Sequence, residues 1–117
     1  MRRMLLVAAA GLLASSSATA FNLSFLGDSV IQRLTSADAR MLNAAVHAAL
    51  TAEQEGAEQH WSNPETGASG SVKFRRTFQR GGTPCRSLQI RTSAQATTAG
   101  GVYELCRQAD GTWTFGS

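Results

Sequence analysis

The stretch CRSLQIRTSAQATTAGGVYELCRQADGTW, residues 85–113, decides the fold that we predict for this chain. It holds two runs of alternating apolar residues, which begin at Cys85 and end near Cys106. Asp110-Gly111 follows the second cysteine, and a type I′ turn requires positive φ at both central residues, which Asp and Gly tolerate best. The stretch therefore predicts antiparallel strands that fold back twice, with one pair of cysteines placed to join them.

The N-terminus has the three parts of a secretory signal peptide. Arg2-Arg3 are basic, residues 4–13 are apolar, and Ala18-Thr19-Ala20 has the small-x-small pattern of a cleavage site. The alternative is a membrane anchor or a buried helix, but the apolar run is shorter than the roughly 20 residues that span a bilayer. We expect cleavage after Ala20, with residue 21 offering no cysteine for a lipoprotein anchor. The chain then divides into a signal peptide (1–20), an N-terminal arm (21–33) and one domain (34–117).

Both cysteines lie in the part that would be exported. An even cysteine count in an exported chain suggests a disulfide, and Cys85–Cys106 is the one pairing possible within the chain. Two free, buried thiols are the alternative. Closing a loop of about 20 residues stabilises a fold by roughly 3 kcal/mol. Such a bond matters here because a mature chain of about 97 residues has only a thin core.

One long helix is expected over Thr35–Glu55. Thr35 or Ser36 is a suitable N-cap, and with Thr35 as the cap Asp38 completes an acidic form of the capping box. Gly56 is expected to end the helix. Apolar residues recur at three- and four-residue steps and predict one buried stripe: Met41, Leu42, Ala45, Val46, Ala49 and Leu50.

The rest of the chain reads as short strands and turns. Strands are expected at 59–62, 71–79, 85–92, 102–108 and 112–115, with turns at 63–67 and 80–84 and a hairpin loop with frayed strand ends at 93–101. Trp61 is expected to be buried. Alternation over 71–79 places Arg76 on the inward face, either at an edge of the core or with its guanidinium extended out to solvent. A short helical turn is expected at 28–33. The predicted fold is α+β: one N-terminal helix packed on a small antiparallel meander of four or five strands, with one disulfide.

The sequence offers no residues arranged for catalysis, a metal or a cofactor. His47 and His60 have no ligand spacing with the cysteines, and oxidised cysteines cannot act as nucleophiles. Gly81-Gly82 and Gly100-Gly101 are turn glycines rather than a phosphate loop. We therefore expect no enzyme activity and no cofactor.

The charge is distributed unevenly along the chain. Residues 21–70 carry six acidic and two basic side chains, whereas residues 71–117 carry seven basic and two acidic ones. Either the two halves attract each other in the fold, or the second half presents a basic face to an anionic partner. Lys73, Arg75, Arg86 and Arg107 are the candidate face, and a merely solvated surface is the alternative. After export, the candidate ligands are phosphates, anionic lipid heads or peptidoglycan carboxylates rather than nucleic acid.

Three segments together resemble a known family. They are Trp61-Ser62-Asn63-Pro64-Glu65-Thr66-Gly67, then Cys85-Arg86, then residues 106–113, CRQADGTW. In this order they are similar to the C-terminal domain of the rickettsial 17 kDa surface antigen family, over roughly residues 34–115. The resemblance implies a proteobacterial envelope protein, in the periplasm or at the cell surface, with no established enzymatic activity. Many members carry a lipoprotein cysteine and a glycine-rich segment before this domain, and residues 21–33 take that place here.

Two functions follow from these observations. The first is a non-enzymatic, exported envelope or surface-antigen protein of a Gram-negative bacterium, associated with the outer membrane or free in the periplasm. The alternative is a secreted or periplasmic binding or inhibitor module, which uses the basic strand face against an anionic envelope component or a protein. The sequence does not fix the oligomeric state.

Overall fold

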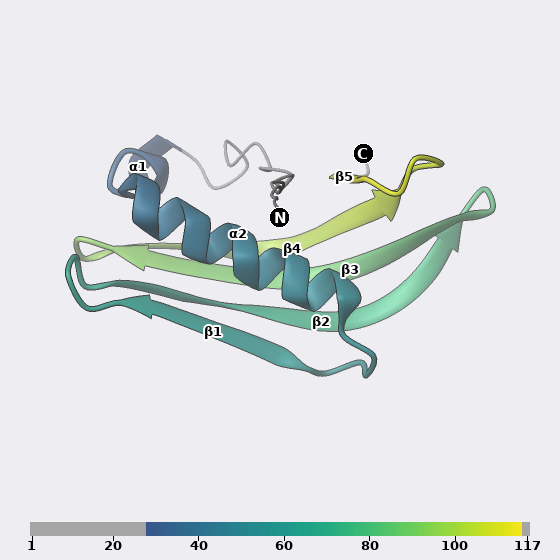
Figure 1. Ribbon diagram of the computed structural model, residues 1–117, viewed down its shortest axis with the longest axis horizontal. Coiled ribbons are helices and arrows are strands. Elements are labelled where there is room, and N and C mark those ends of the chain that lie inside the picture. The colour runs from purple at the N-terminus through teal and green to yellow at the C-terminus, as the bar shows by residue number, and fades with distance from the viewer. Residues whose placement is uncertain (1–27, 116–117) are drawn as a thin grey trace, which may run out of the picture.

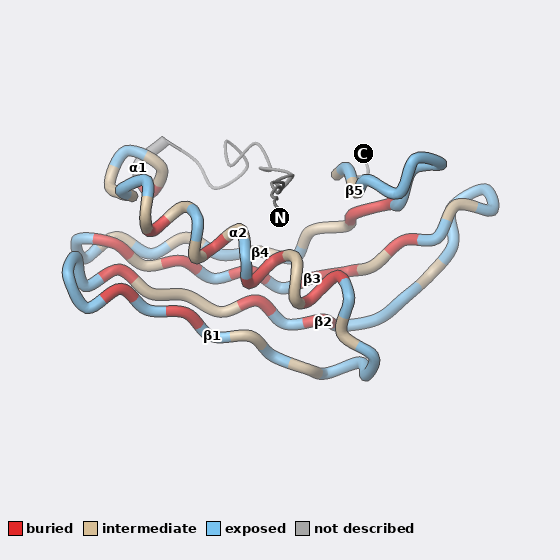
Figure 2. The backbone as a smooth tube through the Cα atoms, viewed as in Figure 1, coloured by how far each residue is buried: buried red, intermediate tan, exposed pale blue. Residues whose placement is uncertain are grey.

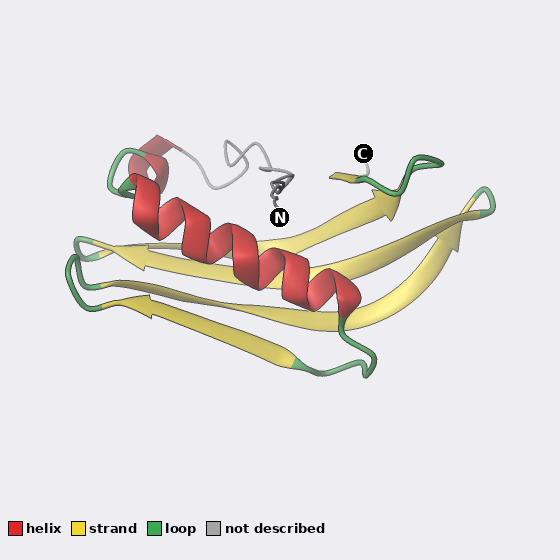
Figure 3. Ribbon diagram, viewed as in Figure 1, coloured by secondary structure: helices red, strands yellow, loops and turns green. Residues whose placement is uncertain are grey.

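The computed structural model describes residues 28–115, which form a helix lying across one face of a five-stranded sheet (Figures 1 and 3). The predicted signal peptide, its cleavage site and residues 21–27 of the expected arm lie outside the described residues. The elements follow the chain as α1 (Asp28–Ile31), α2 (Ser36–Thr51), β1 (Glu58–Asn63), β2 (Ala68–Arg80), β3 (Thr83–Ala94), β4 (Thr97–Arg107) and β5 (Trp113–Phe115).

The sheet is an antiparallel meander in the order β1-β2-β3-β4-β5. This confirms the predicted α+β fold with one helix on one face. We call the face that α2 covers the inner face and the opposite one the outer face. The strands β2, β3 and β4 are longer than expected, so the central strands extend beyond the end of α2 (Figure 1).

The core lies between α2 and the inner face. The predicted helix stripe is confirmed, with Leu42, Ala45, Val46, Ala49 and Leu50 buried and Met41 half-buried. Buried and exposed positions alternate along the strands beneath the helix, as Figure 2 shows. The inward members on the sheet are chiefly apolar: Trp61, Val72, Phe74, Leu88, Ile90 and Leu105. Val30 of α1 is also fully buried, so this part of the expected arm packs into the core.

The start of α2 is joined to the sheet by a buried carboxylate. Thr35 is the N-cap, and the predicted capping box with Asp38 is present. Asp38 is fully buried, and its Oδ1 accepts hydrogen bonds of 2.8 Å from both Asn63 Nδ2 and Thr66 Oγ1. Thr66 Oγ1 in turn accepts from the backbone N–H of Ala68. The Asn63–Gly67 turn is therefore held against the helix through one side chain.

These hydrogen bonds keep Asp38 ionised. Burial by itself would raise the pKa of Asp38, because a low-dielectric site disfavours the charged form. Hydrogen bonds from Thr35, Thr66 and Asn63 outweigh the burial and hold the pKa of this carboxyl below its usual value. The capping network therefore stabilises the fold only while the carboxylate is charged.

A β-bulge in β2 changes which side chains face the core. The register shifts between Phe74 and Arg76, with Phe74 opposite Leu88 and Arg76 opposite Ser87. The extra residue, Arg75, turns the following positions over, since side chains alternate along a strand. Arg76 is therefore exposed on the outer face, and the expectation that it lies at the inward edge of the core is wrong.

The hairpin turns also differ from the sequence-based expectation. Residues 93–101 form the expected hairpin, but its strands stay paired up to a two-residue turn at Gln95-Ala96, both at positive φ (50° and 64°), instead of fraying into a longer loop. Gly100 and Gly101 consequently lie within β4 instead of a turn, and a Cβ on Gly101 would stand 3.0 Å from the Tyr103 hydroxyl.

The turn between β4 and β5 is not type I′. Gly111 has φ +90°, but Asp110 does not have positive φ. Instead, the N–H of Gly111 bonds the carbonyl of Gln108 at 2.9 Å, and Asp110 Oδ1 accepts from the N–H and hydroxyl of Thr112. Asp110 stabilises the turn through its side chain, as in an Asx turn, and does not itself adopt a left-handed backbone conformation.

We expect Asp38→Ala to lower the free energy of unfolding by about 3 kcal/mol, because it removes one half of the capping box and leaves the buried amide of Asn63 and the hydroxyl of Thr66 without their acceptor. The pH dependence provides the sharper test. A carboxyl whose pKa is lowered in the folded state stabilises fully above its unfolded value of 3.8 and loses this effect as the pH falls further. The stability difference between wild type and Asp38→Asn, measured by urea unfolding, should therefore shrink below about pH 4. A difference that stays constant down to pH 2 would contradict the network.

Replacing Gln95-Ala96 by Asn-Gly should raise the free energy of unfolding by about 1 kcal/mol, because both positions have positive φ and Asn-Gly adopts it with less strain. Urea denaturation of the variant checks this. The matched control is Ala109→Gly, at a turn position without positive φ, where glycine should lower stability. No gain in the Asn-Gly variant would argue against this turn.

Candidate functional site

The four residues predicted to form one anionic-ligand face fall into two separate pairs. Lys73 and Arg75 lie on the outer face, on the exposed side of β2. Arg86 and Arg107 lie on the inner face, where both border a cleft beyond the end of α2. The side chains that the sequence grouped together are therefore on opposite sides of the sheet.

Arg86 has a structural role at the C-terminal end of α2. Its Nη1 donates hydrogen bonds to the carbonyls of Ala49 (3.0 Å) and Ala52 (2.8 Å), and its guanidinium carbon lies 4.0 Å from the centroid of the Phe74 ring. A cation here satisfies carbonyls that the helix leaves unpaired and faces the negative end of its dipole. Burial lowers the pKa of Arg86, and the nearby carboxylate of Glu55 opposes that effect.

The helix α2 ends before the residue expected from the sequence, and Arg86 bonds the carbonyl of the residue that follows its last one. The helix stops at Thr51, and Ala52 has extended φ and ψ, so its carbonyl can accept from Arg86. Glu55, expected in the last turn of the helix, instead accepts from the N–H of Thr77 on β2 at 3.0 Å. The link between helix and sheet thus replaces the last predicted turn.

The cleft at the end of α2 has a volume of about 550 Å³. Its walls come from the end of α2, the distal halves of β2 and β3, the end of β4 and the turn before β5. Arg107 lies opposite Trp113 in the β4–β5 register, and both line the cleft. Arg107 is exposed, and it makes no hydrogen bond or ion pair with the residues from 28 to 115.

The outer face carries more positive charge than the sequence indicated. Because of the bulge, Arg76 and Arg80 join Lys73 and Arg75 on this face, and Arg91 lies there on β3, between buried neighbours. We call these five residues the outer strip: Lys73, Arg75, Arg76, Arg80 and Arg91. A bulge leaves no mark in the alternating pattern of β2, so the sequence alone could not place Arg76 here.

Contacts order part of the outer strip. Arg76 and Arg80 lie over the ring of Phe78, at 4.7 Å and 5.4 Å from its centroid, and Arg80 pairs with Glu104. Arg75 Nη1 donates to the hydroxyl of Ser87 at 3.3 Å. Cation–π contacts of this kind hold guanidiniums in place while leaving their edges open to water or to an anion.

A shallow depression of about 450 Å³ lies beside the outer strip. Arg91 borders it together with hydroxyl side chains and one histidine: His60, Ser62, Ser69, Ser71 and Ser93. His60 lies 3.7 Å from Glu58 and is largely exposed. Hydroxyls beside a guanidinium can bond the hydroxyl and phosphate oxygens of a phosphorylated sugar.

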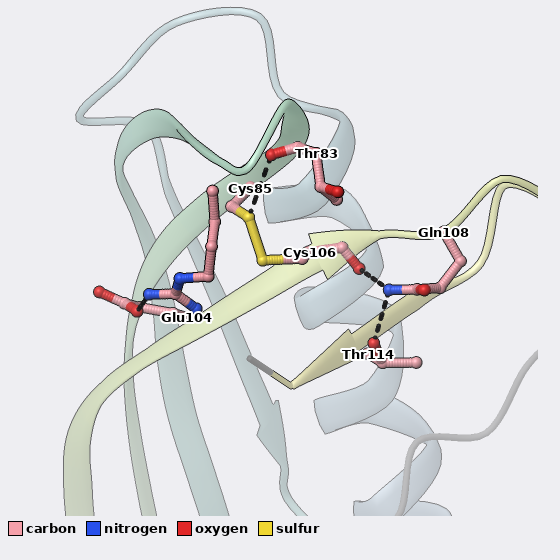
Figure 4. The surroundings of a disulfide bond; sticks show 7 residues. Thr83, Cys85, Glu104, Cys106, Gln108 and Thr114 are labelled. Atoms are coloured by element: carbon pink, nitrogen blue, oxygen red, sulfur yellow. Dashed lines mark hydrogen bonds and ion pairs between the residues drawn. A yellow bond between two sulfur atoms is a disulfide. The ribbon is translucent and has the colours of Figure 1, made fainter. Parts of the chain in front are cut away.

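The predicted disulfide is present between Cys85 and Cys106 (Figure 4). The two residues are direct partners in the β3–β4 register, and both are buried. Beyond Cys106, the Nε2 of Gln108 donates to the Cys106 carbonyl (3.2 Å) and to Thr114 Oγ1 (2.9 Å), which ties β5 to β4. The disulfide therefore lies where the long hairpin and the short last strand meet.

Residues 28–115 contain no group of three or more His, Cys, Asp or Glu side chains close enough to hold a metal ion. His47 is on α2 and His60 is on β1, and both described cysteines are in the disulfide. Within the same residues, no helix has the length and apolar character needed to span a membrane.

Comparison with known protein families shows which family part of the chain resembles. Residues 48–114 match a protein family described as 17 kDa outer membrane surface antigen. The matched segment begins in α2 and ends in β5, so it contains the whole sheet up to Thr114. Neither the curated proteins nor the solved structures returned a match.

Removing the disulfide should lower the free energy of unfolding by roughly 3 kcal/mol, because the bond restricts the unfolded chain. Thermal or urea unfolding of wild type with and without reductant measures this. The double variant Cys85→Ala/Cys106→Ala is the control, and its free energy of unfolding should be the same with and without reductant. Identical stability of wild type with and without reductant would refute a stabilising role.

Proposed function

The chain belongs to the 17 kDa outer membrane surface antigen family, and from this premise we propose that it is a non-enzymatic, exported envelope protein of a Gram-negative bacterium. Two observations support export. Residues 1–20 have the pattern of a cleavable signal peptide, and the only two cysteines of the chain form a disulfide, as is usual in oxidising compartments.

The outer strip is the observation that carries a role for this protein at the envelope. Five cationic side chains lie on the face that α2 leaves open. The carboxylates of Glu58 and Glu104 lie on the same face, so positive charge predominates there. The cations lie on β2 and β3, the two strands with the longest pairing, so their spacing is set by the centre of the sheet. A fixed array of guanidiniums favours phosphate and carboxylate groups, which they bind in a bidentate manner.

We therefore place the outer face against the anionic components of the outer membrane. Phosphates of lipids or of lipid-linked sugars are the expected ligands, and the depression beside Arg91 offers hydroxyls for the attached sugars. Each basic residue near an anionic surface contributes about 1 kcal/mol, so several acting together give stable but salt-sensitive association. This docking needs no membrane-spanning segment.

The same strip also supports a second function, that of a periplasmic or secreted module that binds an acidic protein. Guanidiniums stacked on an aromatic ring, as Arg76 and Arg80 are on Phe78, are common at protein interfaces as well. Cell fractionation separates the two functions. Recovery with the outer membrane, followed by release in high salt, supports docking on the membrane, whereas recovery in the soluble periplasmic fraction supports the binding module.

The purified protein should sediment with vesicles that contain anionic lipids and not with neutral phosphatidylcholine vesicles. The double variant Lys73→Glu/Arg91→Glu should bind at least tenfold more weakly, because it reverses two charges of the outer strip. The matched control, Arg40→Glu/Arg107→Glu, makes the same charge change away from the outer face and should keep most of the binding. Equal losses in both variants would show that net charge, and not the outer strip, drives the association.

A further inference from the structure

The cleft beyond the end of α2 has the dimensions and the chemistry of a small-molecule site. Its volume of about 550 Å³ lies within the usual range of ligand pockets, roughly 300–1,000 Å³. It opens on the inner face, whereas the outer strip lies on the opposite side of the sheet. A ligand in this cleft would therefore meet different charged side chains from those of the envelope contact proposed above.

Arg86 gives the cleft a guanidinium with a fixed position. Nη1 is held by two helix carbonyls, and the ring of Phe74 lies against the guanidinium plane. Nε and Nη2 make no hydrogen bond with any residue in the described part of the chain. Since the group is ordered before a ligand arrives, little conformational entropy is lost when these donors bind an anion.

Arg107 gives the cleft a second guanidinium on the neighbouring strand. Leu105 is the direct partner of Arg86, so Arg107 is its diagonal neighbour on the same face, a separation of about 7–8 Å between backbones. Two long side chains at this separation can converge on one oxyanion. The residues that line the cleft include no carboxylate, and Glu55, whose charge acts on Arg86, is bonded to Thr77.

The remaining walls are largely apolar. Leu50 closes the cleft on the helix side, Pro84 on the β3 side and the half-exposed indole of Trp113 on the β5 side. A fully hydrated inorganic anion would leave these surfaces without a partner. An apolar or aromatic group beside the oxyanion would cover them and remove apolar surface from water.

We propose that this cleft binds an oxyanion, a carboxylate or a phosphate, carried on a small apolar or aromatic body. Arg107 binds the anion together with the free edge of Arg86, and the apolar body lies against Trp113 and Pro84. The ring of Trp113 orients the ligand, and the disulfide, through Cys85 in the wall, holds the two strands that carry the arginines.

The test is a titration followed by NMR through the indole N–H signals, with three probes of similar size: 3-phenylpropionate, phenyl phosphate and the neutral 3-phenylpropionamide. The Trp113 signal should shift with the anions, while that of the buried Trp61 stays in place. Preference for one anion identifies the carboxylate or the phosphate as the group that the cleft takes. The proposal would be overturned if neither anion shifted the Trp113 signal, or if the neutral amide bound with the same affinity as the anions.

Variants test the arginine assignment. Arg107→Gln should weaken binding of the preferred anion at least tenfold, whereas Arg91→Gln, which removes the same charge from the outer strip, should leave it within twofold. Should Arg107→Gln lower the melting temperature, Arg107→Lys keeps the charge but not the planar fork and should still bind at least threefold more weakly. An equal loss in Arg91→Gln and Arg107→Gln would reduce the effect to net charge and refute the site. Because the vesicle assay uses the opposite face, its result is independent of this one.

Discussion

The position of the helix on the sheet depends on the buried carboxylate of Asp38. It caps its own helix through Thr35 and accepts from Asn63 and Thr66, so one charged group joins the start of α2 to the β1–β2 turn. At the other end, Arg86 bonds the last carbonyls of the same helix. A negative group at the N-terminus and a positive group at the C-terminus each match the helix dipole. With both ends fastened, the helix covers one face of the sheet and leaves the other open.

This arrangement gives the basic residues of the second half of the chain different tasks. Arg86 stabilises the fold through Nη1, which bonds helix carbonyls, and its side chain also lines the cleft. Arg107 stands at the same cleft without a structural partner among the described residues, which makes it the better indicator of ligand binding. The outer strip belongs to the open face, where Phe78 orders two of its guanidiniums. Because the chain belongs to a family of outer membrane surface antigens, we propose phosphate groups of the envelope as the partner of that open, cationic face.

The disulfide links these features. It joins Cys85 of β3 to Cys106 of β4, two of the strands that extend past the end of the helix (Figure 1). The cleft and the β4–β5 turn lie at this same end. A covalent bond here keeps the strands that carry Arg86 and Arg107 in register where the core is too small to do so alone. A disulfide of this kind persists in the oxidising compartment that the signal-peptide pattern predicts.

Features set by short-range patterns could be predicted from the sequence alone. The capping box at Thr35, the apolar stripe of the helix, the burial of Trp61 and the pairing of the cysteines all follow from residue type and spacing, and the structure confirms each one. The placement of the arginines could not be predicted in this way. One bulge at Arg75 inverts every later side chain of β2, and the alternating sequence reads the same with or without it. Arg86 bonds carbonyls of Ala49 and Ala52, which are distant from it in sequence, at a helix end that comes earlier than predicted. Both depend on contacts between segments far apart in the chain, so only the tertiary structure decided which arginines support the fold and which remain free to bind.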